Sequence, residues 1–166
     1  MKLYRLQALQ RLPLSLDDAW AFFSRPENLR AITPPALDFR ITNTPPEVMY
    51  AGAIITYTVR PLLGVPVRWV TEITHLRAPY FFVDEQRFGP YRFWHHQHHF
   101  RPVDGGVEVE DLVHYGLPLG PLGTVAQALV VRRQLEAIFA YRRDALEARF
   151  GTFPAKEDAQ SVGYQR

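Results

Sequence analysis

The stretch that decides the fold runs from Asp84 to Phe100 and reads DEQRFGPYRFWHHQHHF. Two runs that favour strands flank the pair Gly89-Pro90, and this pattern is typical of a β-hairpin. The second run holds four of the six histidines of the chain. The rest of the sequence decides which face of that strand is buried.

Further strands are expected on both sides of the hairpin. Segments of period two or of β-branched composition are separated by turns rich in Gly, Pro and Asp, which predicts an antiparallel meander. We expect one strand at 3–12 and six more from residue 38 onward. These six begin around Phe39 and then cover 54–59, 67–76, 80–88, 91–101 and 107–117.

Helical patterns precede and follow the meander. Ser15 can cap a short helix after the first strand, and Pro26 suits the first turn of a second one. A long helix is expected over residues 124–150. Its helically spaced positions are Val125, Leu129, Leu135, Phe139, Arg142 and Leu146. A twisted antiparallel sheet wrapped around one long helix is an α+β fold, and it leaves room for a cavity on the concave face.

Composition excludes several classes of protein. The 166 residues suit a single domain, which we place at 1–150, followed by a polar, flexible tail at 151–166. There is no cysteine, so disulfides, thiolate nucleophiles and thiolate-bound zinc are excluded. The formal net charge of +2 and the lack of a basic stripe argue against nucleic acid as a partner. No signal peptide or membrane span is evident, so we expect a cytoplasmic protein.

The order of these segments resembles the START-like (SRPBCC) superfamily, and within it the polyketide cyclase/dehydrase-like branch. The resemblance covers roughly residues 1–150 and is carried by PLSLDDAWAFFSRPENL before ITPP, by RWVTEI, by the hairpin, and by DLVHYGLPLGPLG before the long helix. It implies a helix-grip fold with an internal cavity. Members bind lipids, hormones or polyketides, and some catalyse cyclisation or dehydration.

The alternation of side chains along a strand divides the histidine group. Trp94, His96, His98 and Phe100 share one face, whereas His95 and His99 share the other face with Gln97. The larger apolar groups accompany His96 and His98. We therefore expect these two on the concave side and His95 and His99 toward water.

The strand after the hairpin offers a partner for the inner histidines. Asp111 shares its face with Val109, Val113 and Tyr115, so it reads as a buried carboxylate. A buried carboxylate needs a hydrogen-bonding or charged partner. The short turn at 104–106 brings His96 or His98 opposite it.

Three interpretations of this pair remain open. The His-x-His pattern can bind a metal ion with Asp111, Asp84 or Glu85, although no further spacing signature supports it. A histidine with Asp111 can instead transfer protons during enolisation, cyclisation or dehydration, with Tyr57 or Tyr115 donating to a substrate oxygen. In the third interpretation the pair only lines a ligand cavity or satisfies its own hydrogen bonds.

We expect the protein to bind a small hydrophobic or aromatic molecule between the sheet and the long helix, as a monomer or homodimer, with no cofactor or metal. Two alternatives are a cofactor-free cyclase or dehydratase, with His96, His98 and Asp111 as catalytic residues, and a stress- or cell-division-associated interaction protein without a small ligand. The expected ligand-binding residues are Trp69, Phe82, Asp84, Gln86, Trp94, Val113, Tyr115, Leu129 and Arg132.

Overall fold

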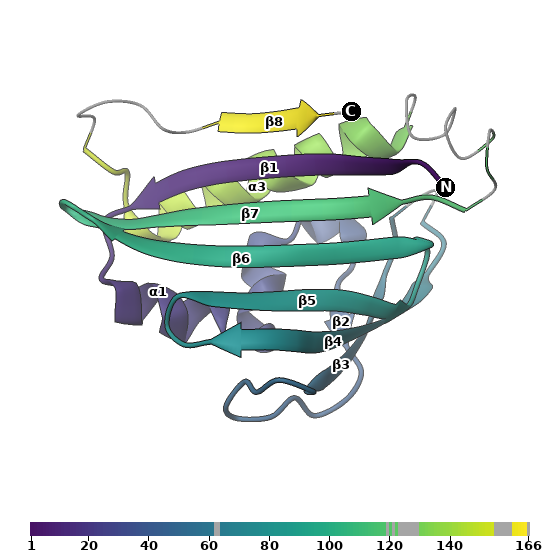
Figure 1. Cartoon of the computed structure of the whole chain (residues 1–166), viewed down its shortest axis with the longest axis horizontal. Coiled ribbons are helices and arrows are strands. Elements are labelled where there is room, and N and C mark those ends of the chain that lie inside the picture. The colour runs from purple at the N-terminus through teal and green to yellow at the C-terminus, as the bar shows by residue number, and fades with distance from the viewer. Residues whose placement is uncertain (62–63, 119, 121, 123–129, 155–160, 166) are drawn as a thin grey trace.

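One antiparallel sheet of eight strands, in the order β2-β3-β4-β5-β6-β7-β1-β8, forms the body of the protein (Figure 1). The computed structural model describes residues 1–61, 64–118, 120, 122, 130–154 and 161–165. The strands are β1 (Leu3–Leu12), β2 (Arg40–Ile41), β3 (Ile54–Val59), β4 (Val67–Arg77), β5 (Phe81–Phe88), β6 (Phe93–Val103), β7 (Gly106–Gly116) and β8 (Ser161–Gln165). The helices are α1 (Leu16–Phe23), the 3-10 helices η1 (Pro26–Ile32) and η2 (Pro35–Leu37), and α3 (Arg132–Phe150).

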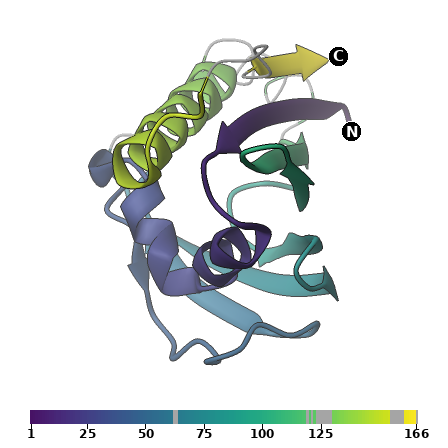
Figure 2. The ribbon, with the colours of Figure 1, turned by 90° about the vertical axis from the view of Figure 1, so that its left-hand side faces the viewer.

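The helices lie on the concave side of the curved sheet. Figure 2 shows α3 passing across the top of the curve and α1 lying below it, with η1 close to α3. Ser15 caps α1 as expected, because its side chain accepts a hydrogen bond from the backbone amide of Asp18. The α+β architecture expected from the sequence is confirmed. No helix in the described ranges has the length and apolar composition that crossing a membrane requires.

The register of three central strands positions the inner histidines. The turn between β6 and β7 is tight, with Val103 paired to Gly106, and Gly105 adopts a φ of 82° that favours glycine. Counting back from this turn places His98 directly opposite Asp111. On the other side of β6, Asp84 of β5 pairs with His96. All four side chains therefore project from adjacent positions on one face.

The core beneath α1 is aromatic. The indole of Trp20 makes edge contacts with Phe82 and Phe100, with ring centroids 5.9 and 5.8 Å apart. Phe23 packs against Phe100 at 5.3 Å. These contacts join α1 to β5 and β6, and they fill one end of the concave face while the rest of that face holds a cavity.

The structure differs from the sequence expectations at the C-terminus. The sequence predicts a flexible tail over residues 151–166, yet Ser161–Gln165 forms β8, which pairs with β1. The described part of the long helix begins at Arg132, and Leu129 lies outside the described residues. Edge pairing of β8 depends on where the free edge of β1 lies, and this cannot be read from local sequence.

We expect Gly106→Ala to destabilise the fold. A Cβ at Gly106 would overlap the carbonyl oxygen of Leu12 on β1, so the two strands would have to separate. Such overpacking costs about 1–3 kcal/mol of unfolding free energy. Urea denaturation measures the loss, with Asp104→Ala in the same turn as the control. Equal stabilities of the two variants would contradict the close approach.

Candidate functional site

A cavity of about 220 Å³ lies between the sheet and the helices α1, η1 and α3. Its walls are largely aromatic, and they include Phe39, Tyr57, Trp69, Phe82, Trp94 and Phe139. Apolar walls with a few polar groups are the usual composition of a small-molecule site. The cavity is therefore the candidate functional site.

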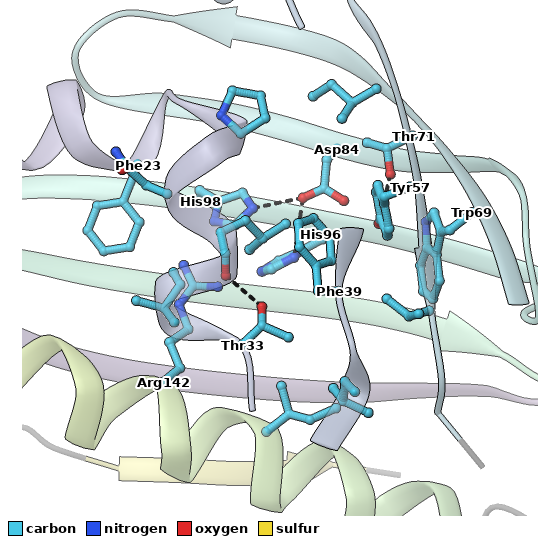
Figure 3. A pocket seen from close by; sticks show the side chains of 18 of the residues that line it. Phe23, Thr33, Phe39, Tyr57, Trp69, Thr71, Asp84, His96, His98 and Arg142 are labelled. Carbon is cyan, nitrogen blue, oxygen red and sulfur yellow. Dashed lines mark hydrogen bonds and ion pairs between the residues drawn. The ribbon is translucent and has the colours of Figure 1, made fainter. Parts of the chain in front are cut away.

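Five charged or titratable side chains form a buried group at one wall of this cavity, which we call the polar cluster. Its members are Asp84 of β5, His96 and His98 of β6, Asp111 of β7 and Arg142 of α3. All except Asp111 line the cavity, and Figure 3 shows Asp84 directed toward the two imidazoles. Asp111 is not among the lining residues and is joined to them by its contacts with the two histidines and Arg142.

Asp84 contacts both histidines through one oxygen. Its Oδ2 lies 2.8 Å from Nε2 of His98 and 3.3 Å from Nδ1 of His96. The other oxygen, Oδ1, accepts a 3.4 Å hydrogen bond from the indole Nε1 of Trp94. The carboxylate is thus held in one orientation by its neighbours on β6.

Asp111 contacts the opposite nitrogens of the same two rings. Its Oδ1 lies 3.0 Å from Nε2 of His96, 2.9 Å from Nδ1 of His98 and 3.3 Å from Nη2 of Arg142. The contact with His98 is short but lacks hydrogen-bond geometry. The guanidinium of Arg142 also lies near the rings of Phe23 and Phe139, which shield the ion pair from water.

The contacts of His96 favour its charged form. Burial alone would lower the pKa of His96, but the carboxylates of Asp84 and Asp111 outweigh it and raise the pKa to about 9. Burial would likewise raise the pKa of Asp84, yet the two histidines hold it well below its usual range. Arg142 and the histidines do the same for the pKa of Asp111. An imidazolium between two carboxylates can donate from both nitrogens at once.

Aromatic rings fix the positions of the histidines. The rings of His96 and His98 are 3.8 Å apart between centroids, and Phe82 stacks on His98 at 4.1 Å. Tyr57, also in the cavity wall, contacts the hydroxyl of Thr71 at 3.2 Å. Burial, with the charge of Asp84, raises the pKa of Tyr57, so its hydroxyl stays protonated.

The structure brings together seven of the residues that were expected at the site. Trp69, Phe82, Asp84, Trp94, His96 and His98 line the cavity, and Asp111 joins them through the histidines. Their common face follows from strand periodicity. The contact between His96 and Asp111 is made at hydrogen-bonding distance.

Three expected ligand-binding residues are absent from the described cavity wall. Gln86 instead bonds the backbone of Tyr91 through both ends of its amide and so closes the turn after β5. Val113 and Tyr115 are fully buried in a core cluster with Tyr4 and Leu135. Alternation identifies the buried face but does not tell a cavity wall from packed core.

Arg142 lines the described cavity wall, as does the exposed Arg25, whereas Arg132, which was expected there from the sequence, is not among the described lining residues. Arg132 is exposed and pairs with Glu136 at 3.0 Å on the surface of α3. Arg142 shares the buried stripe of α3 with Leu135, Phe139 and Leu146. The sequence signal that would have identified Arg142 is its position as a charged residue within an apolar helical stripe.

The other two histidines of β6 lie on the convex face, as expected. His95 and His99 are half-buried there, and Nδ1 of His95 lies 2.7 Å from Glu85. They share the strand with His96 and His98 but do not reach the cavity. They therefore serve as matched controls for the inner pair.

We expect Arg142→Leu to be far more destabilising than Arg132→Leu. The first change removes a buried partner of Asp111, for which losses of about 3–5 kcal/mol are typical. The second breaks an exposed pair within one helix, worth less than about 1 kcal/mol. Chemical denaturation of both variants measures the difference, and similar losses would contradict the buried ion pair.

The shifted pKa of His96 predicts a loss of stability in alkaline solution. The folded protein holds the proton up to about pH 9, whereas the unfolded chain releases it near the ordinary value of 6.5. The free energy of unfolding should therefore fall between these pH values, by roughly 3 kcal/mol.

The assignment of this alkaline decline to His96 can be checked with His96→Gln, whose side chain has no proton to lose in this pH range. Denaturation of this variant at several pH values should show no such decline. The contributions of Asp84 and Asp111 act elsewhere, because carboxylates with lowered pKa lose their effect only as pH falls below about 3.8. An identical alkaline decline in the variant would assign it to another group.

The chain resembles solved structures over most of its length. A protein from Thermus thermophilus matches with a TM-score of 0.65 at 16% identity, covering 88% of this chain and 96% of that one. A Mycobacterium smegmatis protein matches with 0.62 at 15%, covering 87% and 92%. Major latex-like protein 151 from Panax ginseng matches with 0.55 at 16%, covering 81% and 96%.

Sequence comparison adds nothing to this likeness, since no protein-family model and no curated protein matches the chain. At these identities the structures share the fold alone. The helix-grip fold expected from the sequence is therefore confirmed.

Proposed function

We propose that the protein binds a small, mainly aromatic molecule in the cavity, with an oxygen-bearing end toward the polar cluster. The observation that carries this proposal is an aromatic cavity whose charged lining residues, apart from the exposed Arg25, belong to the polar cluster. Apolar walls supply most of the binding free energy through burial of the ligand, and the few polar groups set its orientation.

Two unpaired donors support an oxygenated ligand. Nε1 of Trp69 and Nε of Arg142 are buried and have no hydrogen-bond partner, and both residues line the cavity. A buried donor without a partner costs about 1–3 kcal/mol. A ligand with carbonyl, carboxylate or phenol oxygens would supply the missing acceptors once a small rotation of each side chain turns its nitrogen toward the cavity. Aliphatic hydrocarbons would leave both donors unsatisfied.

Filling the cavity should abolish ligand binding. Ile138 of α3 is half-buried in the wall, so in Ile138→Trp the larger ring occupies ligand space. The probe is the fluorescent dye anilinonaphthalene sulfonate, titrated into metal-free protein. We expect one dye molecule per wild-type chain and at least about tenfold weaker binding by the variant, or about 1.4 kcal/mol.

The control for this change is Ala137→Trp on the exposed side of the same helix. It adds a tryptophan without entering the cavity, so dye binding should be unchanged. Native mass spectrometry of the purified wild-type protein then tests for a co-purified organic molecule. Equal dye binding by all three proteins would place the dye on the surface and count against the cavity.

A second candidate function is the proton-transfer chemistry of a cyclase or dehydratase. His96 and Asp84 are ion-paired in one cavity and both have displaced pKa values, which makes them candidates for acid–base chemistry. The neutral imidazole of His96, which forms as pH rises toward about 9, would take a proton from a carbon next to a carbonyl group. The protonated hydroxyl of Tyr57 would donate a hydrogen bond to the carbonyl oxygen.

Deuterium exchange tests this second function without knowledge of the substrate. Acetophenone in D₂O has exchangeable methyl protons, and NMR follows their loss. Catalysis predicts at least about 100-fold faster exchange with wild-type protein than with His96→Gln, an effect at the low end for general acid–base catalysis. His99→Gln on the convex face is the control. Equal rates for all three would argue for binding alone.

A further inference from the structure

We propose that Asp84, His96 and His98 together bind one divalent transition-metal ion at the wall of the cavity. The atoms that would bind it are Oδ2 of Asp84, Nδ1 of His96 and Nε2 of His98. One such atom from each residue lies within 4.8 Å of the others. The proposal goes beyond ligand binding and needs no organic molecule to be present.

The separations between these atoms suit a metal ion of ordinary size. Oδ2 of Asp84 is 2.8 Å from Nε2 of His98 and 3.3 Å from Nδ1 of His96. Zinc bonds to nitrogen and oxygen of about 2.0–2.2 Å place neighbouring ligand atoms about 3–3.5 Å apart. One ligand atom of each residue already lies within 4.8 Å of the others, so the side chains would close around the ion while the backbone register of β5 and β6 need not change.

The side chains around the three metal ligands also suit a metal site. Metal-bound histidines usually direct their other ring nitrogen toward a carboxylate. Here Nε2 of His96 and Nδ1 of His98 both lie within 3.0 Å of Oδ1 of Asp111. Asp84 faces one nitrogen of each ring and Asp111 faces the other. Asp84 itself is oriented by the indole of Trp94 through its remaining oxygen.

A metal ion would also give His98 a role that the metal-free arrangement lacks. His98 is 5% exposed, and its Nδ1 has no partner of hydrogen-bonding geometry. With Nε2 bound to a metal, Nδ1 must carry the proton. A small rotation of the ring would then direct that proton to Asp111, which Arg142 already holds in place.

The donor set selects the class of ion. Two imidazoles and one carboxylate suit Zn²⁺, Fe²⁺, Mn²⁺ or Co²⁺, whereas the lack of cysteine disfavours ions that prefer thiolates. Three protein ligands leave at least one coordination position open. Because all three residues line the cavity, we infer that a ligand oxygen can occupy that position.

Charge balance indicates which oxygen would bind. The charges of Asp84, Asp111 and Arg142 sum to −1, and a divalent ion with neutral histidines brings the group to +1. An anionic oxygen, such as a carboxylate or phenolate, would neutralise it. This part of the inference rests on the proposed function, since it assumes an oxygenated ligand in the cavity.

Titration of metal-free wild-type protein with Co²⁺ tests the site. Visible absorption reports coordination by nitrogen and oxygen, and calorimetry with Zn²⁺ gives affinity and stoichiometry. We expect one equivalent per chain. Asp84→Asn and His98→Ala should each weaken binding by at least about 100-fold, and Asp111→Asn by about 10–100-fold as a residue that orients ligands. Circular dichroism confirms that each variant is folded.

The convex histidines provide the control, because His95, His99 and His114 can bind metals at the surface. His95→Ala should leave the affinity unchanged. Binding that depends on His95 but not on His98 or Asp84 would overturn the proposal, as would no stoichiometric binding of Zn²⁺, Co²⁺, Mn²⁺ or Fe²⁺ to folded wild-type protein. The titration contains no organic ligand and the dye experiment no metal, so the two proposals can fail separately.

Discussion

Two carboxylates held away from water on the inner face of the sheet determine how the rest of the site is built. Burial of an ionised carboxylate costs several kcal/mol unless cations and hydrogen bonds compensate. Asp84 and Asp111 receive this compensation from His96, His98 and Arg142. The cations come from β6 and α3, so the same ion pairs that stabilise the acids also hold the helix against the sheet.

This requirement explains why the cavity wall is divided into polar and aromatic parts. Four members of the polar cluster occupy adjacent positions on three neighbouring strands, which the pairing of β5, β6 and β7 places side by side, and Arg142 joins them from α3. Rings of Phe23, Phe82 and Phe139 pack around its cations and imidazoles and limit the access of water. Electrostatic interactions are stronger in such surroundings, and preorganised groups are suited to orienting a ligand or an ion.

The prediction from sequence was strongest where local periodicity carries the information. Alternation along residues 94–100 identified His96 and His98 as inward and His95 and His99 as outward, and the apolar neighbours of Asp111 marked it as buried. Strand limits such as 54–59 agree with β3, because turn residues bound them. Alternation correctly predicted that Val113 and Tyr115 face inward. It did not show that they belong to the packed core and not to the cavity wall.

The sequence by itself determined the order of the main elements from β1 to α3 and the faces of the strands, because these depend on neighbours close in the chain. The resemblance of that order to a known superfamily implied the helix-grip fold. Only the tertiary structure decided that Asp84 of β5 meets both histidines and that Arg142 reaches Asp111. It also decided that β8 pairs with β1. Contacts of this kind depend on register between strands and on the path of α3 across the sheet. Both are set by packing over the whole molecule. Side-chain alternation shows which face of a strand a residue lies on, but it does not show which residue of the neighbouring strand lies opposite.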